Sequence, residues 1–380
     1  MTVARTQSAT EEGNERERPA VTDLTHIDFS SFPAAHWFLD DIQKAIANPR
    51  APYTPHGGDG QILEELRGRL GSVLQRTIQP GEIMLTTGVQ NGIYLALKSL
   101  IRPGDRVAVP DPDYMLAQET AESAGATVVR VPVGWSTGAA EPEPGALASA
   151  AEDPVRAFFF TSPCNPTGAI WSAETLSTLA STLVSPDGYL IADELYSRVV
   201  YGGRFRHAAG LPGLEHRVVT LLGPSKVESL SGFRIGVAVG PDDVIASMTT
   251  HMRLVTLRAP AYAQFSLRQW YSVQDEAFMA DRTARFQRVR DLAVDRLGRI
   301  EGVSVIAPAG GVYLLAQVRG SGSRLAEALE QAGILVTDGR IFGRAGESGI
   351  RICFAHQEER LLVALDQMAA IIADLEGQKP

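Results

Sequence analysis

Short apolar runs, rich in β-branched and aromatic residues, alternate with longer helical patterns through the middle of this chain. The runs predict strands at Arg106–Val109, Thr127–Val133, Ala157–Thr161, Tyr189–Asp193, Val218–Leu222 and Ile235–Val239. Amphipathic stretches between several of them predict helices at Gln90–Leu100, Tyr114–Ala124 and Ala173–Leu183. Strands this short and this uniformly apolar are typical of an α/β fold, in which a mostly parallel sheet lies between layers of helices.

The pattern changes after Pro241, where long helical stretches are mixed with single strands. Helices are predicted at Asp242–Leu254, Ala277–Ile300, Arg324–Ala332 and Glu358–Leu375. Strands are predicted at Val303–Ile306, Gly311–Val318, Ile334–Thr337 and Gly349–Phe354. This mixture indicates a second, smaller α+β domain at the C-terminal end.

The composition suits a globular protein with room for two cores, since the 380 residues are 44% hydrophobic and 21% charged. No apolar run approaches the roughly 20 residues of a membrane span. Residues 1–24 are largely polar, mix Glu with Arg, and lack the apolar region of a signal peptide. We therefore expect a disordered N-terminal arm and a cytoplasmic protein.

Charge and cysteine content argue against two classes of protein. The net charge of −9 disfavours a nucleic-acid partner, because phosphate backbones require a basic face. Cys164 and Cys353 are the two cysteines, too few for a disulfide framework or a cysteine metal site. The seven histidines show no metal-ligand spacing, so no metal is expected.

The segment around Lys226 carries the most chemistry. Lys226 follows the small residues Gly223-Pro224-Ser225, and Gly232-Phe233-Arg234-Ile235-Gly236 comes shortly after it. A lysine held in a crevice can lose its proton and form a Schiff base, and an arginine supplies a fixed cation for a phosphate. An ordinary surface lysine in a loop is the alternative reading.

Polar residues stand at three predicted strand ends. Asn165 follows the strand that ends at Thr161, Asp193 ends its own strand, and Lys226 follows Val218–Leu222. Ligands of open α/β sheets bind beyond the carboxyl ends of the strands. The three side chains are therefore expected in one crevice.

Four motifs in this order and spacing resemble the class I/II aminotransferases. They are Asn165-Pro166-Thr167-Gly168, Asp193-Glu194-Leu195-Tyr196, the Lys226 segment, and Arg351-Ile352-Cys353-Phe354, and the likeness extends from about Ile27 to about Leu375. Members of this family are fold type I enzymes that use pyridoxal 5′-phosphate (PLP). The resemblance implies a large domain at residues 51–285 with a seven-stranded type of sheet. It also implies a small domain at residues 286–380, to which the N-terminal segment 25–50 is expected to belong.

The resemblance implies roles around the pyridine ring. Lys226 would bind PLP, Asp193 would pair with the protonated ring nitrogen, and both Tyr196 and Asn165 would hydrogen-bond the ring oxygen. Tyr114 would stack on the ring. The plainer readings are a helix cap for Asp193, a turn for Asn165, and core packing for the two tyrosines.

A second group would hold the phosphate and the substrate. Gly88 and Val89 open a helical pattern whose N–H groups point at an anion, and Arg234 and Ser225 would add a charge and a hydroxyl. Arg351 resembles the arginine that binds the substrate α-carboxylate, and a guanidinium fork fits a carboxylate. An arginine on the exposed face of an edge strand is the alternative.

Two features concern Tyr53 and the residues before the lysine. Tyr53 resembles the tyrosine that reaches the phosphate of the neighbouring subunit's cofactor, which implies an obligate homodimer. Gly223 stands where the family usually has a serine, and Pro224 is unusual there. One phosphate donor is therefore lost or replaced by water.

Transamination is the first interpretation of the reaction, since it needs no further catalytic residue beyond Lys226. Pro224-Ser225-Lys226 also resembles the cystathionine β-lyase branch, so a β-eliminating C–S lyase is the alternative, with decarboxylation or deamination on the same scaffold. The departures from the family favour an enzyme of specialised metabolism. A PLP-fold transcription regulator would need a basic domain in front, where this chain has a polar tail. The side chain of the substrate stays open; Arg253 and Arg258 are candidates for a second carboxylate.

Overall fold

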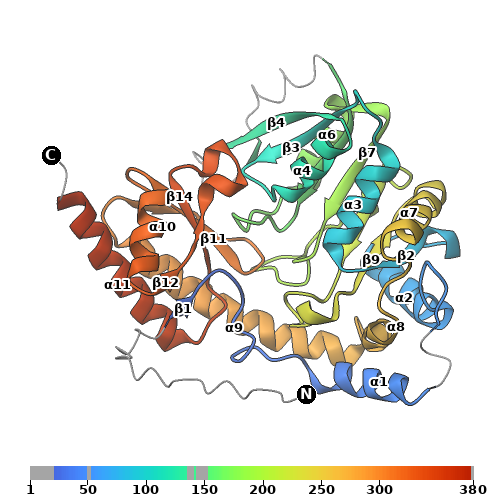
Figure 1. The fold of residues 1–380 in the computed structure, drawn as a ribbon, viewed down its shortest axis with the longest axis horizontal. Coiled ribbons are helices and arrows are strands. Elements are labelled where there is room, and N and C mark those ends of the chain that lie inside the picture. Colours follow the sequence, from blue (N-terminus) through green and yellow to red (C-terminus); the bar gives the residue numbers. More distant parts are fainter. Residues whose placement is uncertain (1–20, 49–52, 135–140, 143–152, 378–380) are drawn as a thin grey trace, which may run out of the picture.

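The computed structural model describes residues 21–48, 53–134, 141–142 and 153–377 (Figure 1). The predicted N-terminal arm lies outside the described residues up to residue 20, and Thr22–Asp23 form a short strand, β1. Residues 135–140 and 143–152 also lie outside them, on either side of the short strand β5 (Glu141–Pro142).

An eight-stranded sheet forms the centre of the larger part of the molecule. Its strand order is β2 (Ile83–Thr86), β9 (Gly236–Val239), β8 (Val218–Leu222), β7 (Val184–Asp193), β6 (Val155–Thr161), β3 (Arg106–Asp111), β4 (Thr127–Gly134) and β5. Neighbours from β8 to β4 are parallel. β9 runs antiparallel to both β2 and β8, and β5 runs antiparallel to β4. The mostly parallel sheet and the α/β class are thereby confirmed.

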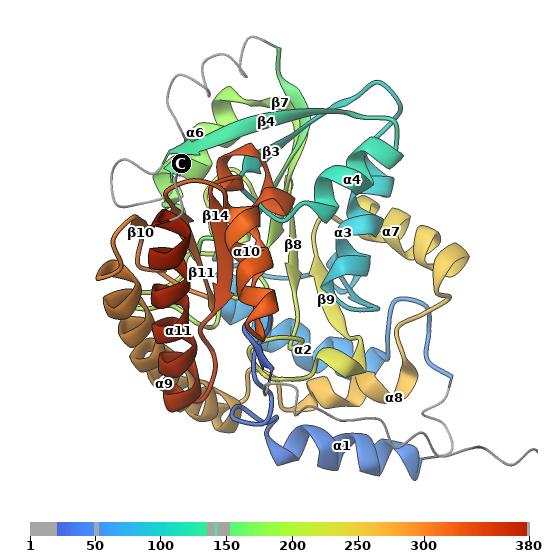
Figure 2. The ribbon, with the colours of Figure 1, turned by 60° about the vertical axis from the view of Figure 1, so that its left-hand side comes forward.

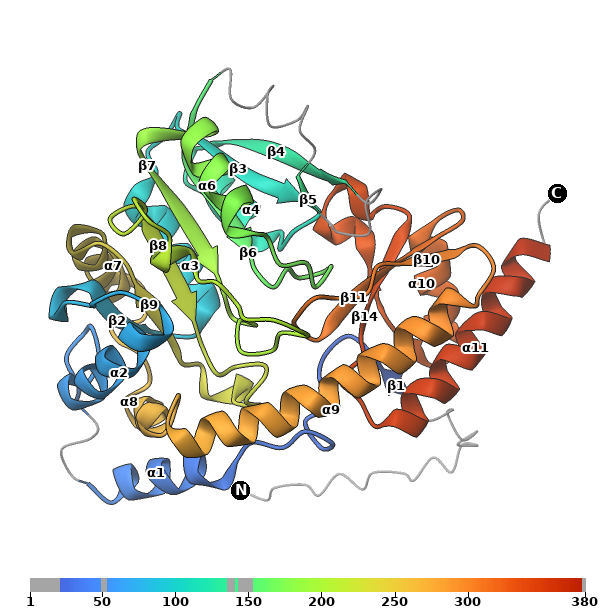
Figure 3. The ribbon, with the colours of Figure 1, turned by 180° about the vertical axis from the view of Figure 1, so that it is seen from behind.

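Helices cover both faces of this sheet. They are α2 (Gly60–Val73), α3 (Val89–Leu100), α4 (Leu116–Ser123), α6 (Ala173–Thr182), α7 (Asp242–Val255) and α8 (Ala261–Gln264). α3 packs against α4 and α7, and the view from behind brings α6 to the front of the sheet (Figure 3). The expected strands and helices of this part all form, with ends shifted by a few residues. β2 was not expected, because a short, wholly buried segment shows no alternation that marks a strand.

A four-stranded antiparallel sheet centres the smaller part, with the order β10 (Val303–Val305), β11 (Tyr313–Val318), β14 (Gly349–Cys353) and β13 (Thr337–Asp338). Its helices are α9 (Val273–Gly298), α10 (Gly322–Gln331) and α11 (Glu358–Gly377). β1 pairs in parallel with β12 (Ile334–Leu335). The long helix α9 runs along both parts and joins them (Figures 1 and 3), and α11 packs beside it (Figure 2).

Two hydrophobic cores divide the described residues. The N-terminal segment contributes to both: Leu24, Ile27 and Phe32 belong to the smaller core, whereas Phe38 and Ala45 of α1 (His36–Ile46) belong to the larger one. The reason is the amphipathic face of α1, which packs against the 3-10 helix Phe265–Arg268 and α8. The segment 25–50 was expected to join the small domain; its described part, residues 25–48, is shared between the two cores. Among the described residues, no helix has both the length and the apolar character of a membrane span.

Candidate active site

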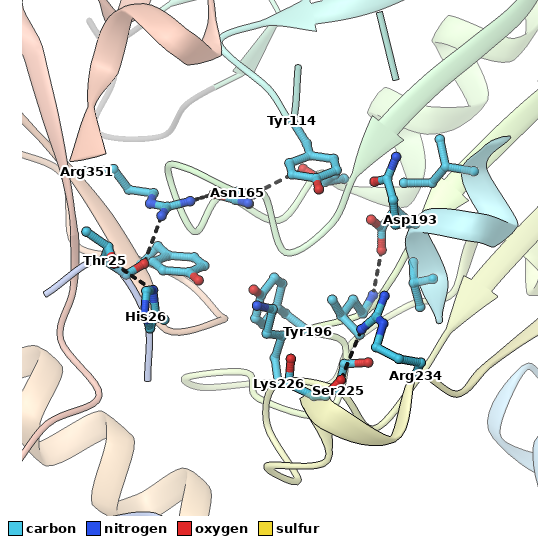
Figure 4. Close-up of a pocket in the computed structure, with 17 residues that line it drawn as sticks. Thr25, His26, Tyr114, Asn165, Asp193, Tyr196, Ser225, Lys226, Arg234 and Arg351 are labelled. Atoms are coloured by element: carbon cyan, nitrogen blue, oxygen red, sulfur yellow. Dashed lines mark hydrogen bonds between the residues drawn. The ribbon is translucent and has the colours of Figure 1, made fainter. Parts of the chain in front are cut away.

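A cavity of about 260 Å³ lies where the two cores meet (Figure 4). Nine residues singled out in the sequence line it: Val89, Tyr114, Asn165, Asp193, Tyr196, Ser225, Lys226, Arg234 and Arg351. Gly88 lies beside the guanidinium of Arg234. Tyr53 does not line this cavity. The structure therefore brings together residues spread over more than half of the chain.

The sheet explains this convergence. Asp193 is the last residue of β7, and Asn165 and Lys226 follow the ends of the flanking strands β6 and β8. Because these strands are parallel neighbours, their carboxyl ends meet at one edge. Arg351 comes from β14 of the smaller sheet and closes the opposite side (Figure 4).

One end of the cavity gathers hydrogen-bond donors from three segments of the chain. Gly88 has φ of +78° and precedes α3, and a Cβ at this position would lie 2.6 Å from Nη2 of Arg234. Only glycine therefore lets the guanidinium reach the start of the helix. The Oγ of Ser225 is buried and has no partner among the described residues. A helix N-terminus, a guanidinium and a free hydroxyl fit a phosphate group.

Asp193 is buried at the wall of the cavity, and no ion pair with a cation of the described residues holds it. Its Oδ1 accepts a hydrogen bond of 3.1 Å from the backbone N–H of Leu195. Burial, reinforced by the charge of Glu194, raises the pKa of Asp193 to about 7. A buried carboxyl with a raised pKa fits a positively charged ring nitrogen, which would restore its ionised form.

Asp113 supports this wall and was not singled out in the sequence, although it directly precedes Tyr114. Its carboxylate accepts hydrogen bonds from Thr161 Oγ1 at 2.6 Å and from Tyr114 N at 2.5 Å. Thr161 Oγ1 in turn accepts from the backbone N–H of Asn165 at 3.1 Å. Asp113 therefore holds the backbone of Tyr114 directly and the backbone of Asn165 through Thr161. Burial raises the pKa of Asp113 to about 7.

Lys226 points into the same space (Figure 4). Burial lowers the pKa of its amine, and the charges of Arg351 and Arg234 lower it further. An amine with a lowered pKa is more often free of its proton, which is the form that attacks a carbonyl. The Lys226 amine can therefore act as a nucleophile in this cavity.

Arg351 is already held by several partners. Its Nη1 donates to Asn165 Oδ1, and its Nη2 donates to the backbone oxygen of Thr25 and to Thr337 Oγ1, each at 2.9 Å. The guanidinium lies over the ring of Tyr313 at 4.1 Å and that of Phe342 at 5.0 Å. Its Nε has no partner among the described residues. The guanidinium is thus fixed in place with donors left for an anion.

The tyrosines occupy different environments. Tyr196 is buried, with its ring edge-on to Tyr313 at 5.8 Å, and burial raises its pKa well above the usual value. Burial also raises the pKa of Tyr114 to about 12. Tyr53 is 83% exposed, and Arg258 lies over its ring at 4.6 Å. Arg253, the other arginine considered for a second carboxylate, is exposed on α7.

Several lining residues had no recognisable signal in the sequence. They are Thr25, His26, Gln90, Ile93, Thr161, Leu195, Ser231 and Tyr313. Thr25 and His26 follow β1, whose pairing with β12 brings the N-terminal segment to the cavity. Only that long-range pairing places them there, so neither residue type nor spacing could have indicated it.

A mostly parallel α/β sheet whose strand ends carry a half-buried lysine, a buried aspartate and a phosphate-type donor set is typical of a PLP enzyme of fold type I. The family described as aminotransferase class I and II matches residues 27–368, and the chain belongs to it.

Relatives and solved structures agree with this family. The chain is 29% identical to the aspartate/prephenate aminotransferase of Thermus thermophilus over 335 residues, which cover 87% of this chain and 86% of the relative. It is also 29% identical to an arginine–pyruvate transaminase of Pseudomonas aeruginosa, over 89% of this chain and 87% of the relative. The crystal structure of an aspartate aminotransferase from Rhodobacter sphaeroides superposes with a TM-score of 0.88 at 29% identity, covering 97% of this chain and 94% of that one.

The protein is therefore a PLP-dependent aminotransferase of fold type I. The confirmed expectations are the family, the fold class, the cofactor and the class of reaction. The β-eliminating lyase gains no support from these comparisons.

Proposed function

We propose that the enzyme transfers the amino group of an α-amino acid in this cavity. The residues that line it would have the roles predicted from the sequence. The observation that carries the proposal is the convergence of Lys226, Asp193 and Arg351 on one cavity from two separate sheets. These three provide a nucleophilic amine, a buried acid and a carboxylate-binding fork, which together suit an amino acid bound beside PLP.

At the cofactor end, each residue has a defined task. PLP, when bound, supplies an electron-withdrawing ring that stabilises negative charge at the α-carbon of the amino acid. Asp193 keeps the ring nitrogen protonated, and Tyr114 stacks on the ring. The phosphate is held by Gly88, Val89, Ser225 and Arg234. Support comes from the partnerless Ser225 hydroxyl and the raised pKa of Asp193.

At the substrate end, Arg351 binds the α-carboxylate and Asn165 keeps the guanidinium oriented. Lys226 would hold the cofactor and would move the proton at the α-carbon of the substrate. Its lowered pKa supports that role, because a proton carrier works best when its pKa lies near the working pH. Tyr196 and Asn165 hydrogen-bond the ring oxygen.

Incubation of the purified protein with single amino acids, in the absence of any keto acid, tests this function. We expect release of the matching keto acid and conversion of the bound cofactor to pyridoxamine phosphate, in equal amounts. Lys226→Ala should show neither product. Pyruvate with ammonia, and an unchanged cofactor, would instead identify a lyase.

The side chain of the substrate is best found with a panel that includes acidic, basic and aromatic amino acids. Within the described residues, the basic groups that line the cavity are His26, Lys226, Arg234 and Arg351. Neither Arg253 nor Arg258 lines it. Among the described residues, His26 is therefore the one additional basic group available to a second carboxylate.

We further propose a homodimer in which Tyr53 serves the partner's cavity. Tyr53 is 83% exposed, and its loop is tied to a second exposed segment by a contact of 2.9 Å between His56 Nδ1 and the backbone oxygen of Leu257. That segment includes Leu254, which is 81% exposed. Large exposed apolar side chains grouped in this way suit a subunit interface. Cytoplasmic location and specialised metabolism stay predictions from the sequence.

Complementation tests the shared site. Co-expressed Lys226→Ala and Tyr53→Ala chains form heterodimers in which one cavity carries both defects and the other carries neither. Activity should return toward half of the wild-type value per heterodimer. If each single variant is inactive and co-expression restores nothing, Tyr53 acts in its own chain or not at all.

A further inference from the structure

A buried ion pair lies behind the two site residues Tyr196 and Lys226. Arg198 stands two residues after Tyr196, and Glu228 stands two residues after Lys226. Nη1 of Arg198 lies 2.9 Å from Oε1 of Glu228, and their side chains are 5% and 0% exposed. The pair therefore joins the segment that carries Tyr196 to the loop that carries Lys226.

The beginning of α9 completes this cluster. Asp275 Oδ2 lies 2.6 Å from Arg198 Nη1, and Trp270 Nε1 donates to Glu228 Oε1 at 2.8 Å. Arg198 also contacts the exposed Glu276 at 2.8 Å. Because α9 joins the two parts of the molecule, the cluster links the lysine loop to that helix.

The backbone on either side of Glu228 is held as well. Arg282 of α9 is 2% exposed and donates from Nη1 to the backbone oxygen of Val227 at 2.8 Å and to Ser229 Oγ at 3.1 Å. Ser229 Oγ donates to the backbone oxygen of Phe32 at 2.5 Å. Ser229 has φ of +63°, a conformation that needs such support. The three residues after Lys226 are thus each fixed by a named partner.

Burying these charges costs desolvation free energy that an apolar core would not require. Glu228 Oε2 and Asp275 Oδ1 are buried without a partner among the described residues, and burial raises the pKa of both carboxyls. Replacing a buried ion pair with apolar side chains is often neutral or stabilising. Stability alone therefore does not account for these charges, whereas a requirement for fixed geometry does.

We propose that Arg198 and Glu228 are positioning residues, which hold Lys226 and Tyr196 at the separation that proton transfer at the α-carbon requires. The inference rests on the proposed role of Lys226. A misplacement of about 1 Å can lower a catalytic rate by roughly 100-fold. Arg351, which binds the substrate, comes from a different sheet, so substrate binding should be spared.

Glu228→Gln tests this proposal, because it removes the charge while keeping the shape and an acceptor for Trp270. The matched control is Glu82→Gln, which breaks the buried Arg76–Glu82 pair at 2.6 Å, with side chains 8% and 11% exposed, outside the lining of the cavity. The measured quantities are kcat per bound cofactor, the amino-acid KM, and exchange of the substrate α-hydrogen with deuterium from solvent.

In Glu228→Gln, we expect kcat and the exchange rate to fall about 10- to 100-fold, while KM stays within about twofold of the wild-type value. The control should lose thermal stability with kcat per bound cofactor unchanged. Equal kcat values in Glu228→Gln, the control and the wild type would overturn the proposal, and so would a change confined to KM.

A double-mutant cycle gives an independent measurement. Arg198→Lys keeps the charge but loses the fork that reaches Glu228 and Glu276, and the double variant with Glu228→Gln should be no slower than the slower single variant. Additive losses would overturn the proposal. Should Glu228→Gln fail to fold, Trp270→Phe removes one donor to Glu228 and should lower kcat a few-fold with KM unchanged; an unaltered kcat would count against the proposal.

Different results would contradict the proposed function and the positioning role. If the wild-type protein binds no PLP and releases no keto acid, the proposed function itself is wrong. If the wild type transaminates and Glu228→Gln matches the Glu82→Gln control, only the positioning role is wrong.

Discussion

The two ends of the cavity differ in how far their polar groups are already paired. At the substrate end, both Nη atoms of Arg351 are held by Asn165, Thr25 and Thr337, and the guanidinium contacts the rings of Tyr313 and Phe342; its Nε alone has no partner among the described residues. At the cofactor end, the Ser225 hydroxyl has no partner among the described residues, and Asp193 has a pKa of about 7.

This contrast indicates two strategies for binding. The substrate end is preorganised, because the guanidinium keeps its position whether or not a carboxylate is present. The cofactor end leaves buried groups unsatisfied until a phosphate and a ring cation arrive, so cofactor binding should contribute directly to the stability of the fold. Substitutions at the two ends should therefore have opposite effects on the protein without cofactor.

The largest effect is expected from Lys226→Ala, which removes both the covalent attachment and the proton carrier. Turnover should fall by roughly 10²–10⁴-fold from the loss of the proton carrier alone. Borohydride treatment should leave no cofactor attached to the variant, as judged by mass spectrometry. Lys44→Ala, at a lysine that is 73% exposed, is the matched control and should retain both properties. Trapped cofactor in Lys226→Ala would assign attachment to another lysine.

Asp193 should make the stability of the cofactor-free protein depend on pH. Burial raises its pKa from 3.8 to about 7, so the folded state keeps the proton that the unfolded chain releases. Stability therefore falls as pH rises from about 4 to about 7, by roughly 4 kcal/mol at most from this group. Denaturant unfolding at several pH values should show a smaller fall in Asp193→Asn, and a smaller fall in the wild type once PLP is bound. An identical pH dependence in variant and wild type would remove Asp193 as its source.

Arg351→Lys should separate substrate binding from cofactor binding. A lysine offers a point charge where the carboxylate needs a fork. The lost charge-assisted bond is worth roughly 1.5–3 kcal/mol, or about ten- to a hundredfold in affinity for the amino acid. Spectroscopic titrations should show PLP affinity unchanged. Arg234→Lys is the reciprocal control, in which PLP affinity should fall. Loss of PLP from Arg351→Lys would place that arginine at the cofactor end.

The smallest and most discriminating effects are expected from one hydroxyl at each end. Ser225→Ala removes a buried hydroxyl that has no partner among the described residues, so the cofactor-free protein should be as stable or slightly more stable. Its PLP affinity should fall by roughly 0.5–1.5 kcal/mol. Thr337→Val removes an acceptor of Arg351 and should destabilise the cofactor-free protein by about 1–3 kcal/mol. Equal destabilisation in both variants, measured by thermal unfolding, would end the contrast between the two ends.

Local pattern was sufficient for most of the fold and for the residue types of the site. The expected strand Val218–Leu222 has those same bounds in the structure, and β7 ends at Asp193 as expected. Parallel strands buried on both faces leave a continuous apolar run that needs no partner to be recognised. Turn and motif residues at the strand ends likewise predicted that Asn165, Asp193 and Lys226 lie at one edge of the sheet.

Tertiary structure alone decided the parts that depend on distant pairing. β1 brings Thr25 and His26 to the cavity through β12, and α1 joins the larger core although Leu24, Ile27 and Phe32 before it join the smaller one. The Arg198–Glu228–Asp275 cluster likewise assembles from three separate segments. Charged residues in a sequence look alike whether they face water or one another. Only the packing of the elements decides which of them are buried. Packing therefore also sets the desolvation free energy of these charges and the residues that they can hold in position.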